Sequence, residues 1–226
     1  MSALILDTET HDLNGYPIEI AYAPCSFEQG VLVINQNQVF DEYFSCPEPI
    51  ALGALATHHI LEADIAGKPS FDTFKMPQDV QYLVGHNIDY DIKAIQRCQP
   101  DFTVKGICTL ALCRMVWPDL ETHNLSAMYY HCMTDLELAR KHLRHAHNAK
   151  ADIYFTGVIL KTLVEQLGIK DMSSLYVMSE AARIPKKINF GKHRGTAIKD
   201  LDPSYVSWLL RQEDLDPYLR KALVAA

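Results

Sequence analysis

The stretch Ala3-Leu4-Ile5-Leu6-Asp7-Thr8-Glu9 decides the fold of this chain. Its four apolar residues predict a buried strand, and two acidic residues follow at once. Residues two apart in a strand point to the same face, so the carboxylates of Asp7 and Glu9 should emerge side by side at the end of the strand. Two carboxylates that close repel each other unless a cation lies between them. The stretch therefore predicts both a buried strand and a metal site at its end.

The segments that follow this strand predict a mixed α/β architecture. Residues 17–23 and 31–45 have the composition of further strands, and Tyr82-Leu83-Val84 predicts another short buried strand. The clearest helical pattern covers residues 148–163, where apolar side chains recur with the helical period. Strands first, followed by alternating helices and strands, predict an α/β domain with a mixed sheet in which the first strand is central.

The C-terminal part of the chain has a weaker pattern and a different charge. We expect a main domain over residues 1–168, a linker region over 169–189 and a small appendage over 190–226. The net charge of the chain is −7, but residues 185–226 carry eight basic and five acidic side chains. A local basic patch matters more for contact with phosphate than the charge of the whole chain, so the negative total does not exclude a nucleic acid as partner.

The composition of the 226-residue chain is that of a globular protein. Its hydrophobic content of 48% is sufficient for a large core, and no stretch of about 18 uncharged apolar residues predicts a membrane span. The N-terminus has no basic region and too short an apolar run for a signal peptide, so we expect a cytoplasmic protein. The six cysteines include no C-x-x-C pair, which favours reduced thiols over disulfides or structural zinc.

Three further residues complete a candidate site for phosphate chemistry. Asp91 and Asp152 add two carboxylates from distant segments, and such hard oxygen ligands suit Mg²⁺ or Mn²⁺. Two such ions about 4 Å apart can stabilise both the attacking and the leaving oxygen of a phosphoryl displacement. His147 can act as the base for the attacking water, because imidazole titrates near neutral pH. We expect His147 in a mobile loop just before a helix and Asp152 in the first turns of that helix.

Two choices between neighbouring residues accompany this assignment. Asp89 lies two positions before Asp91, and it is interpreted as a solvated residue at a helix start, where an acid is favourable. Asp91 is preferred as the ligand because it follows the aromatic Tyr90. His145 is the alternative to His147, which we prefer for its distance from Asp152 in the sequence.

Together these segments resemble a known family. Asp7-Thr8-Glu9, His86-Asn87-Ile88-Asp89-Tyr90-Asp91 and His147-x4-Asp152 are similar, in order and spacing, to the three exonuclease motifs of the DEDDh 3′–5′ exonucleases. This family includes relatives of the proofreading subunit of bacterial DNA polymerase III. The resemblance covers residues 3–167 and implies an α/β, ribonuclease-H-like mixed sheet flanked by helices, followed by the small C-terminal appendage.

The resemblance also implies an activity and assigns residues to it. The implied reaction is metal-dependent hydrolysis of DNA from the 3′ end to nucleoside 5′-monophosphates, with two Mg²⁺ or Mn²⁺ ions and a histidine as general base. The implied catalytic residues are Asp7, Glu9, Asp91, His147 and Asp152, and the four acids among them are the implied metal ligands. The implied substrate contacts in this domain are Thr8, Leu13, His86 and Asn87.

The C-terminal appendage resembles that of a smaller group within this family. Residues 189–195 (NFGKHRG) and the downstream residues 202–209 (DPSYVSWL) resemble the tail of exonuclease X-like proteins. Glycines flank the basic cluster, so a tight hairpin could bring Lys192 and Arg194 to a backbone phosphate of the substrate.

Tyr205 and Trp208 lie three positions apart in this tail and should share one face of a helix. Two roles are open for this pair of aromatic residues. They could stack on bases of a nucleic acid, or they could anchor the appendage to the domain.

Two other functions are weighed against DNA hydrolysis. An exoribonuclease of the same family, trimming RNA or short oligonucleotides, would carry the same motifs, and only the exonuclease X-like tail favours DNA. A non-catalytic nucleic-acid-binding module should have lost at least one metal carboxylate, but all four are present. The expected partner is a DNA 3′ end, single-stranded or duplex, with RNA as the alternative and no membrane. No feature of the sequence identifies a protein partner.

Overall fold

The computed structural model describes residues 2–188 and 190–225, so Asn189 at the start of the tail motif lies outside the described residues. The chain divides into two compact units, Met1–Ser179 and Glu180–Ala226, which are called the N-terminal unit and the C-terminal unit below. The boundary falls inside the stretch 169–189 that the sequence suggested as a linker region. A helix, Met172–Arg183, runs across this boundary.

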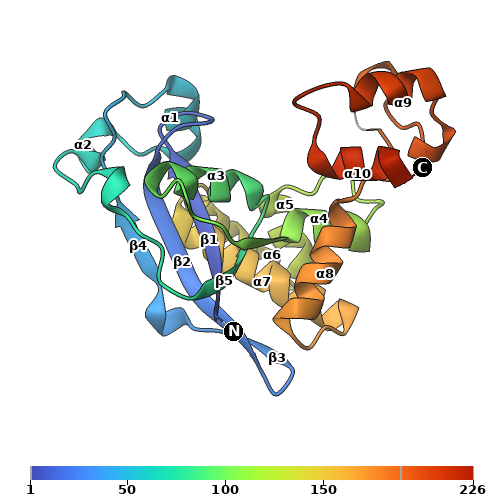
Figure 1. Cartoon of the computed structure of the whole chain (residues 1–226). Coiled ribbons are helices and arrows are strands. Elements are labelled where there is room, and N and C mark those ends of the chain that lie inside the picture. Colours follow the sequence, from blue (N-terminus) through green and yellow to red (C-terminus); the bar gives the residue numbers. More distant parts are fainter. Residues whose placement is uncertain (1, 189, 226) are drawn as a thin grey trace. The chain divides into compact units, whose positions relative to one another are not determined.

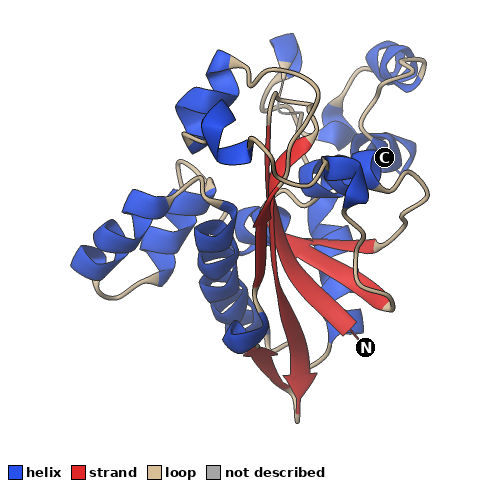
Figure 2. Cartoon of the chain, turned by 90° about the vertical axis from the view of Figure 1, so that its left-hand side faces the viewer, coloured by secondary structure: helices blue, strands red, loops and turns tan. Residues whose placement is uncertain are grey.

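The N-terminal unit is built on a curved, six-stranded mixed sheet (Figure 2). Its strands are β1 (Ser2–Thr10), β2 (Pro17–Glu28), β3 (Val31–Ile34), β4 (Phe40–Tyr43), β5 (Val80–Gly85) and β6 (Lys105–Cys108). The strand order is β3-β2-β1-β5-β6, and β4 also pairs with β2. Strand β1 is antiparallel to β2 and parallel to β5. The strand that carries Asp7 and Glu9 is therefore central, as the sequence predicted.

Helices form most of the structure outside the sheet in both units (Figure 1). The helices are α1 (Leu52–His58), α2 (Glu62–Ile65), α3 (Asp89–Cys98), α4 (Thr109–Val116), α5 (Leu125–Cys132), α6 (Leu136–His142), α7 (Ala149–Leu167), α8 (Met172–Arg183), α9 (Pro203–Leu210) and α10 (Pro217–Ala225). Within the described part of the chain, none of these helices combines the length and the apolar character needed to cross a membrane. The six cysteines are free thiols, four of them buried.

Helix α7 packs along β1 and β2 and confirms the helix predicted over residues 148–163. Its N-cap is Asn148, whose side chain accepts a hydrogen bond from the first turn, and it ends at Gly168 with a φ of 63°. Gly157 lets the helix approach the sheet, because a Cβ atom at this position would lie 3.0 Å from Ile34 Cδ1. This close packing fixes the N-terminal end of α7 relative to the central strand.

The C-terminal unit has a small hydrophobic core of its own. The core side chains are Ile188, Ile198, Leu201, Leu209, Leu219, Ala222 and Leu223. A tight loop leads into this core, where Lys187 pairs with Ala197 and the Gly195 N–H donates to the Ile188 carbonyl at 2.8 Å. Gly191 and Gly195 adopt φ values of 58° and 88°, which glycine tolerates without steric cost. The basic side chains between these glycines are thus displayed on a sharp turn.

Candidate active site

Asp7 and Glu9 lie on one face of β1, where the strand leaves the core. Leu4, Ile5 and Leu6 before them are buried, whereas Asp7 and Glu9 are each half-buried. The period of two in a strand turns both carboxylates to the same side. The end of β1 therefore presents two neighbouring acids at the surface of the sheet.

Asp91 joins them from the first turn of α3. Its Oδ1 atom accepts hydrogen bonds from the Thr8 N–H and the Thr8 hydroxyl, each at 2.9 Å. The Asp91 side chain is thereby held against β1, next to Asp7 and Glu9, and it is buried. Asp89 is exposed at the start of the same helix. The structure thus brings Asp91, and not Asp89, to the end of the central strand.

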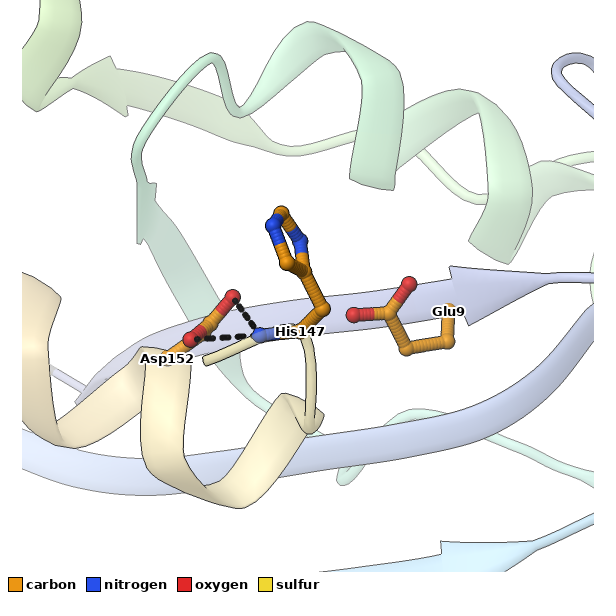
Figure 3. A group of neighbouring side chains, drawn as sticks. All are labelled: Glu9, His147 and Asp152. Atoms are coloured by element: carbon orange, nitrogen blue, oxygen red, sulfur yellow. Dashed lines mark hydrogen bonds between the residues drawn. The ribbon is translucent and has the colours of Figure 1, made fainter. Parts of the chain in front are cut away.

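His147 and Asp152 approach from the N-terminal end of α7 (Figure 3). His147 lies directly before the N-cap residue, in the left-handed region with a φ of 64°, and its imidazole is exposed. Its backbone N–H donates to both carboxylate oxygens of Asp152, at 3.3 Å each. One potential ligand atom each of Glu9, His147 and Asp152 lies within 4.8 Å of the others. These three side chains form a group that could hold a metal ion.

Burial, and for Asp7, Glu9 and Asp91 also the neighbouring carboxylates, disfavours the charged forms of these acids. Burial, and then the charge of Asp91, raises the pKa of Asp7 well above its usual value. Burial, and then the charge of Asp152, raises the pKa of Glu9 to about 9. Burial raises the pKa of Asp91 and of Asp152 to about 7, although hydrogen bonds from Thr8 and from the His147 N–H act in the opposite direction.

A divalent cation fits this donor set. Crowded carboxylates with raised pKa values are stabilised as anions when positive charge is placed between them. Four carboxylates with one imidazole form an oxygen-rich set, which suits Mg²⁺ or Mn²⁺ better than the sulfur- and nitrogen-rich sets that select zinc. The residues present therefore form a candidate site for a divalent cation, and the choice of Mg²⁺ or Mn²⁺ stays a prediction.

Glu19 is a fifth acid at the site, and it was not predicted from the sequence. It lies on β2 directly opposite Glu9 and is only 1% exposed. Its carboxylate accepts hydrogen bonds from Asn148 Nδ2 at 2.5 Å and from the Ala149 N–H at 3.1 Å. Burial raises its pKa to about 7. Glu19 thus fastens the first turn of α7 to the sheet, close to His147.

Two expected substrate contacts face the protein interior. Thr8 is buried and its hydroxyl is bonded to Asp91, so it supports that carboxylate. His86 contacts the Thr109 hydroxyl through Nδ1 at 3.0 Å and the His123 carbonyl through Nε2 at 2.7 Å. Burial lowers the pKa of His86 to about 4, so the ring is neutral. These contacts hold the two side chains in place beside the acids, and their contact with substrate stays a prediction.

The other expected substrate contacts are accessible. Leu13, in the loop after β1, is 74% exposed, and Asn87, before α3, is exposed with a φ of 79°. Lys192 and Arg194 are exposed on the turn of the C-terminal unit. Their contact with substrate stays a prediction.

Two adjoining hollows lie beside the end of β1. The first has a volume of about 280 Å³ and is lined by Thr10, Tyr90, Lys93 and Arg97 among others. The second has a volume of about 380 Å³ and shares Arg97 with the first. Lys93 and Arg97 are one turn apart on α3, so both cations lie on one face of that helix. The second hollow is also lined by Asp12 and Glu48, so it is the first, with its two cations, that suits an anionic chain such as a nucleic acid backbone.

The chain is similar to known exonucleases in its sequence and in its structure. No family model matches the chain. Exodeoxyribonuclease 10 of Escherichia coli K12 is 30% identical to it over 226 residues, covering 97% of this chain and 96% of the relative. The structure of exonuclease X in complex with 5′ overhanging duplex DNA matches with a TM-score of 0.56 and 26% identity, over 77% of this chain and 99% of that one.

A more distant solved structure supports the fold alone. E. coli exonuclease I in complex with a dA16 oligonucleotide matches with a TM-score of 0.50 at 15% identity, over 82% of this chain and 44% of that one. The mixed sheet and its flanking helices are thus shared with solved exonucleases. The predicted ribonuclease-H-like α/β fold is confirmed.

Proposed function

This chain belongs to the exodeoxyribonuclease 10 family, an exonuclease X-like group of DEDDh exonucleases, and we propose that it is a metal-dependent 3′–5′ exonuclease that degrades DNA to nucleoside 5′-monophosphates. One observation carries the proposal. Four acids and a histidine, from β1, α3 and the start of α7, lie together at the end of the central strand. A structural ion pair or a solvated acidic surface would not require acids from three remote segments to be partly buried together.

Asp7, Glu9, Asp91 and Asp152 are the proposed ligands of two Mg²⁺ or Mn²⁺ ions. When bound, the ions would neutralise the charge that develops on the phosphate and on the leaving oxygen. The roles of the protein residues follow from their positions. Thr8 keeps Asp91 directed at the site through two hydrogen bonds, and the N-terminal turn of α7 presents Asp152.

His147 is the proposed general base. Its exposed imidazole extends from the loop before α7, so a ring nitrogen can take the proton of the attacking water. The backbone N–H bond to Asp152 keeps the base next to the metal ligands while the side chain stays free to turn (Figure 3).

DNA is the proposed substrate because the relative at 30% identity is named an exodeoxyribonuclease and the matching exonuclease X structure holds duplex DNA. Leu13 and Asn87 are proposed contacts of the terminal nucleotide, since both are exposed on loops beside the acids. Lys192 and Arg194 are proposed contacts of the backbone. RNA is the alternative substrate, and discrimination would depend on the shape of the site around the 3′ ribose.

Digestion of end-labelled DNA and RNA oligonucleotides of one sequence tests the proposal. With Mg²⁺ or Mn²⁺, we expect a 5′-labelled DNA strand to shorten stepwise while free nucleoside 5′-monophosphates accumulate. Chelator and the Asp152→Asn variant, which keeps the size of the side chain, should both stop the reaction.

Three results would contradict the proposal in different ways. Release of the 5′ label as a mononucleotide would reverse the polarity. Faster digestion of RNA than of DNA would favour the exoribonuclease. Binding without turnover in either metal would indicate a non-catalytic nucleic-acid-binding module.

A further inference from the structure

The C-terminal unit carries a row of stacked aromatic rings. The ring centroids of His193 and Tyr205 are 4.1 Å apart, and those of Tyr205 and Trp208 are 5.6 Å apart with an angle of 17° between the ring planes. Tyr205 and Trp208 lie one turn apart on α9, and His193 comes from the glycine-flanked turn. Two segments of this unit therefore build one row of rings.

The outer ring of this row does not belong to the core of the unit. Tyr205 packs against the hydrophobic core, which includes Ile198 and Leu209. Trp208 is 48% exposed and is not part of that core cluster. Tyr205 thus holds α9 on the core of its own unit, which differs from the anchoring to the main domain considered from the sequence. A half-exposed tryptophan that continues a stack leaves a large flat apolar face for a partner.

Basic side chains flank the stacked rings. Lys192 and Arg194 are exposed on either side of His193. Residues 186–211 contain six basic and only two acidic side chains, in a chain whose net charge is −7. One of the two acids, Asp202, already accepts hydrogen bonds from the Ser204 N–H at 2.8 Å and the Ser204 hydroxyl at 2.5 Å, as the N-cap of α9. The partner of this surface should therefore be anionic.

We propose that His193, Tyr205, Trp208, Lys192 and Arg194 form a binding surface for a single-stranded segment of the substrate. An unpaired base would stack on Trp208 and extend the row of rings, while Lys192 and Arg194 contact the adjacent phosphates. Stacking requires a free base face, which bases inside a duplex do not offer. This inference rests on the proposed nuclease function, and it gives the C-terminal unit the task of retaining the strand. A protein partner is disfavoured by the excess of six basic over two acidic side chains in residues 186–211.

The fluorescence of Trp208 provides a direct test in the full-length chain. The protein has two tryptophans, and Trp117→Phe leaves Trp208 as the one tryptophan, whose emission is separated from that of the tyrosines by its longer wavelength. In chelator, so that the strand is not degraded, a thymidine oligonucleotide of about 20 residues should quench this emission in a saturable way, and a blunt duplex of equal length should not. Absence of quenching by the single strand would overturn the inference and would favour a protein as the partner of this surface.

Affinity measurements on the same oligonucleotide identify the contributing side chains. Trp208→Ala should weaken binding about tenfold, the order expected for the loss of one base stack. Val224→Ala is the matched control, because Val224 is 72% exposed on α10 of the same unit and is not part of the stacked row. Equal effects of the two substitutions would count against stacking.

Salt dependence tests the two cations. Two lost phosphate contacts on a single strand should reduce the slope of log affinity against log salt concentration by about 1.4 in the Lys192→Ala/Arg194→Ala double variant. An unchanged slope would mean that these side chains do not contact phosphate and would overturn that part of the inference.

Hydrolysis of thymidine 5′-monophosphate p-nitrophenyl ester separates this inference from the proposed function. This small substrate cannot reach a second surface, so Trp208→Ala should hydrolyse it at the wild-type rate. If wild-type protein degrades DNA and the ester while Trp208→Ala binds the oligonucleotide as well as wild type, only the binding surface is refuted. If wild-type protein degrades neither substrate, the nuclease proposal itself fails.

Discussion

His147 combines an exposed imidazole with a backbone conformation that most residues avoid. At a φ of 64°, asparagine is among the best-tolerated residues after glycine. We therefore expect His147→Asn to preserve the loop and its N–H bond to Asp152 while it removes the base. The turnover number should fall about 10²- to 10⁴-fold, with a KM and a melting temperature near those of wild type.

His145→Asn is the matched control for this prediction. His145 is exposed two positions earlier, and it was the alternative candidate for the general base in the sequence. Steady-state kinetics on DNA and thermal denaturation of both variants check it. Wild-type turnover by His147→Asn, or strong loss in His145→Asn, would assign the base to a different residue.

Thr8 provides a second prediction at the scale of single residues. Its hydroxyl bonds to Asp91 at 2.9 Å, so Thr8→Val should release that carboxylate partially and lower turnover about fivefold to tenfold. Thr8→Ser keeps the hydroxyl and should restore the rate. KM should stay constant in both variants if the Thr8 hydroxyl acts through the Asp91 carboxylate that it is bonded to. A raised KM in Thr8→Val with normal turnover would return Thr8 to the substrate contacts.

At the scale of elements, the first turn of helix α7 is hydrogen-bonded to Glu19 of strand β2. Glu19→Ala would leave the Asn148 amide and the Ala149 N–H without their acceptor, at a cost of about 1–3 kcal/mol in the free energy of unfolding. Because His147 and Asp152 lie at this end of α7, the metal concentration for half-maximal activity should also rise. Glu19→Gln retains one carbonyl oxygen and should recover most of the stability.

Lys150→Ala is the control within the same helical turn. Lys150 pairs with Asp41 at 3.4 Å but is exposed, so its loss should change stability by less than about 1 kcal/mol. Chemical denaturation and metal titration of activity distinguish the variants. Equal stability of Glu19→Ala and Lys150→Ala would contradict the anchoring role of Glu19.

The sequence predicted those elements whose residues carry a local signal. Strand β1 has an uninterrupted apolar run, and α7 has an N-cap, an apolar period and a terminal glycine, so both were predictable. Strand β6 was missed, because its four residues, Lys105–Cys108, show neither alternation nor a long apolar run. Glu19 was missed for a different reason. A charged residue inside the apolar segment of β2 was the one available signal, and its hydrogen bonds reach residues about 130 positions away.

The residues of the candidate site were likewise predictable only where the sequence carries a local signal. The choice of Asp91 over Asp89 agrees with the structure, since the period of α3 turns Asp91 inward and Asp89 outward. The inward orientation of His86 was not predictable, because it depends on Thr109 and His123 in later segments. Lys93 and Arg97 had a helical spacing in the sequence, but only the packed loop after β1 reveals the hollow they line.

At the scale of the whole molecule, the acidic cluster couples stability to pH. The pKa is about 9 for Glu9 and about 7 for Asp91 and Asp152 in the folded chain, whereas unfolded carboxyl groups titrate near about 4. The folded state therefore binds more protons between these values, so the free energy of unfolding should decrease as pH rises from about 4 to about 9.

Bound cations should reverse this trend, and the increase in melting temperature that Mg²⁺ causes should grow with pH. Thermal denaturation in chelator and in Mg²⁺ across this pH range measures both effects. Asp152→Asn removes one of the titrating groups and should give a flatter curve in chelator. A stability that rises with pH in chelator would show that the acids are not destabilised by burial.

Helix α8, which crosses the boundary between the two units, affects where a shorter gene fragment can end. Ser179 Oγ accepts the Cys108 N–H at 2.8 Å, and the ring of Tyr176 lies 5.9 Å from that of Tyr82. These contacts place α8 against β5 and β6, the last two strands in the sheet order. A gene fragment ending after residue 168 would expose this edge, and uncovered edge strands recruit other chains into aggregates. A fragment ending after Arg183 would retain the cover and should yield dispersed, protease-resistant protein.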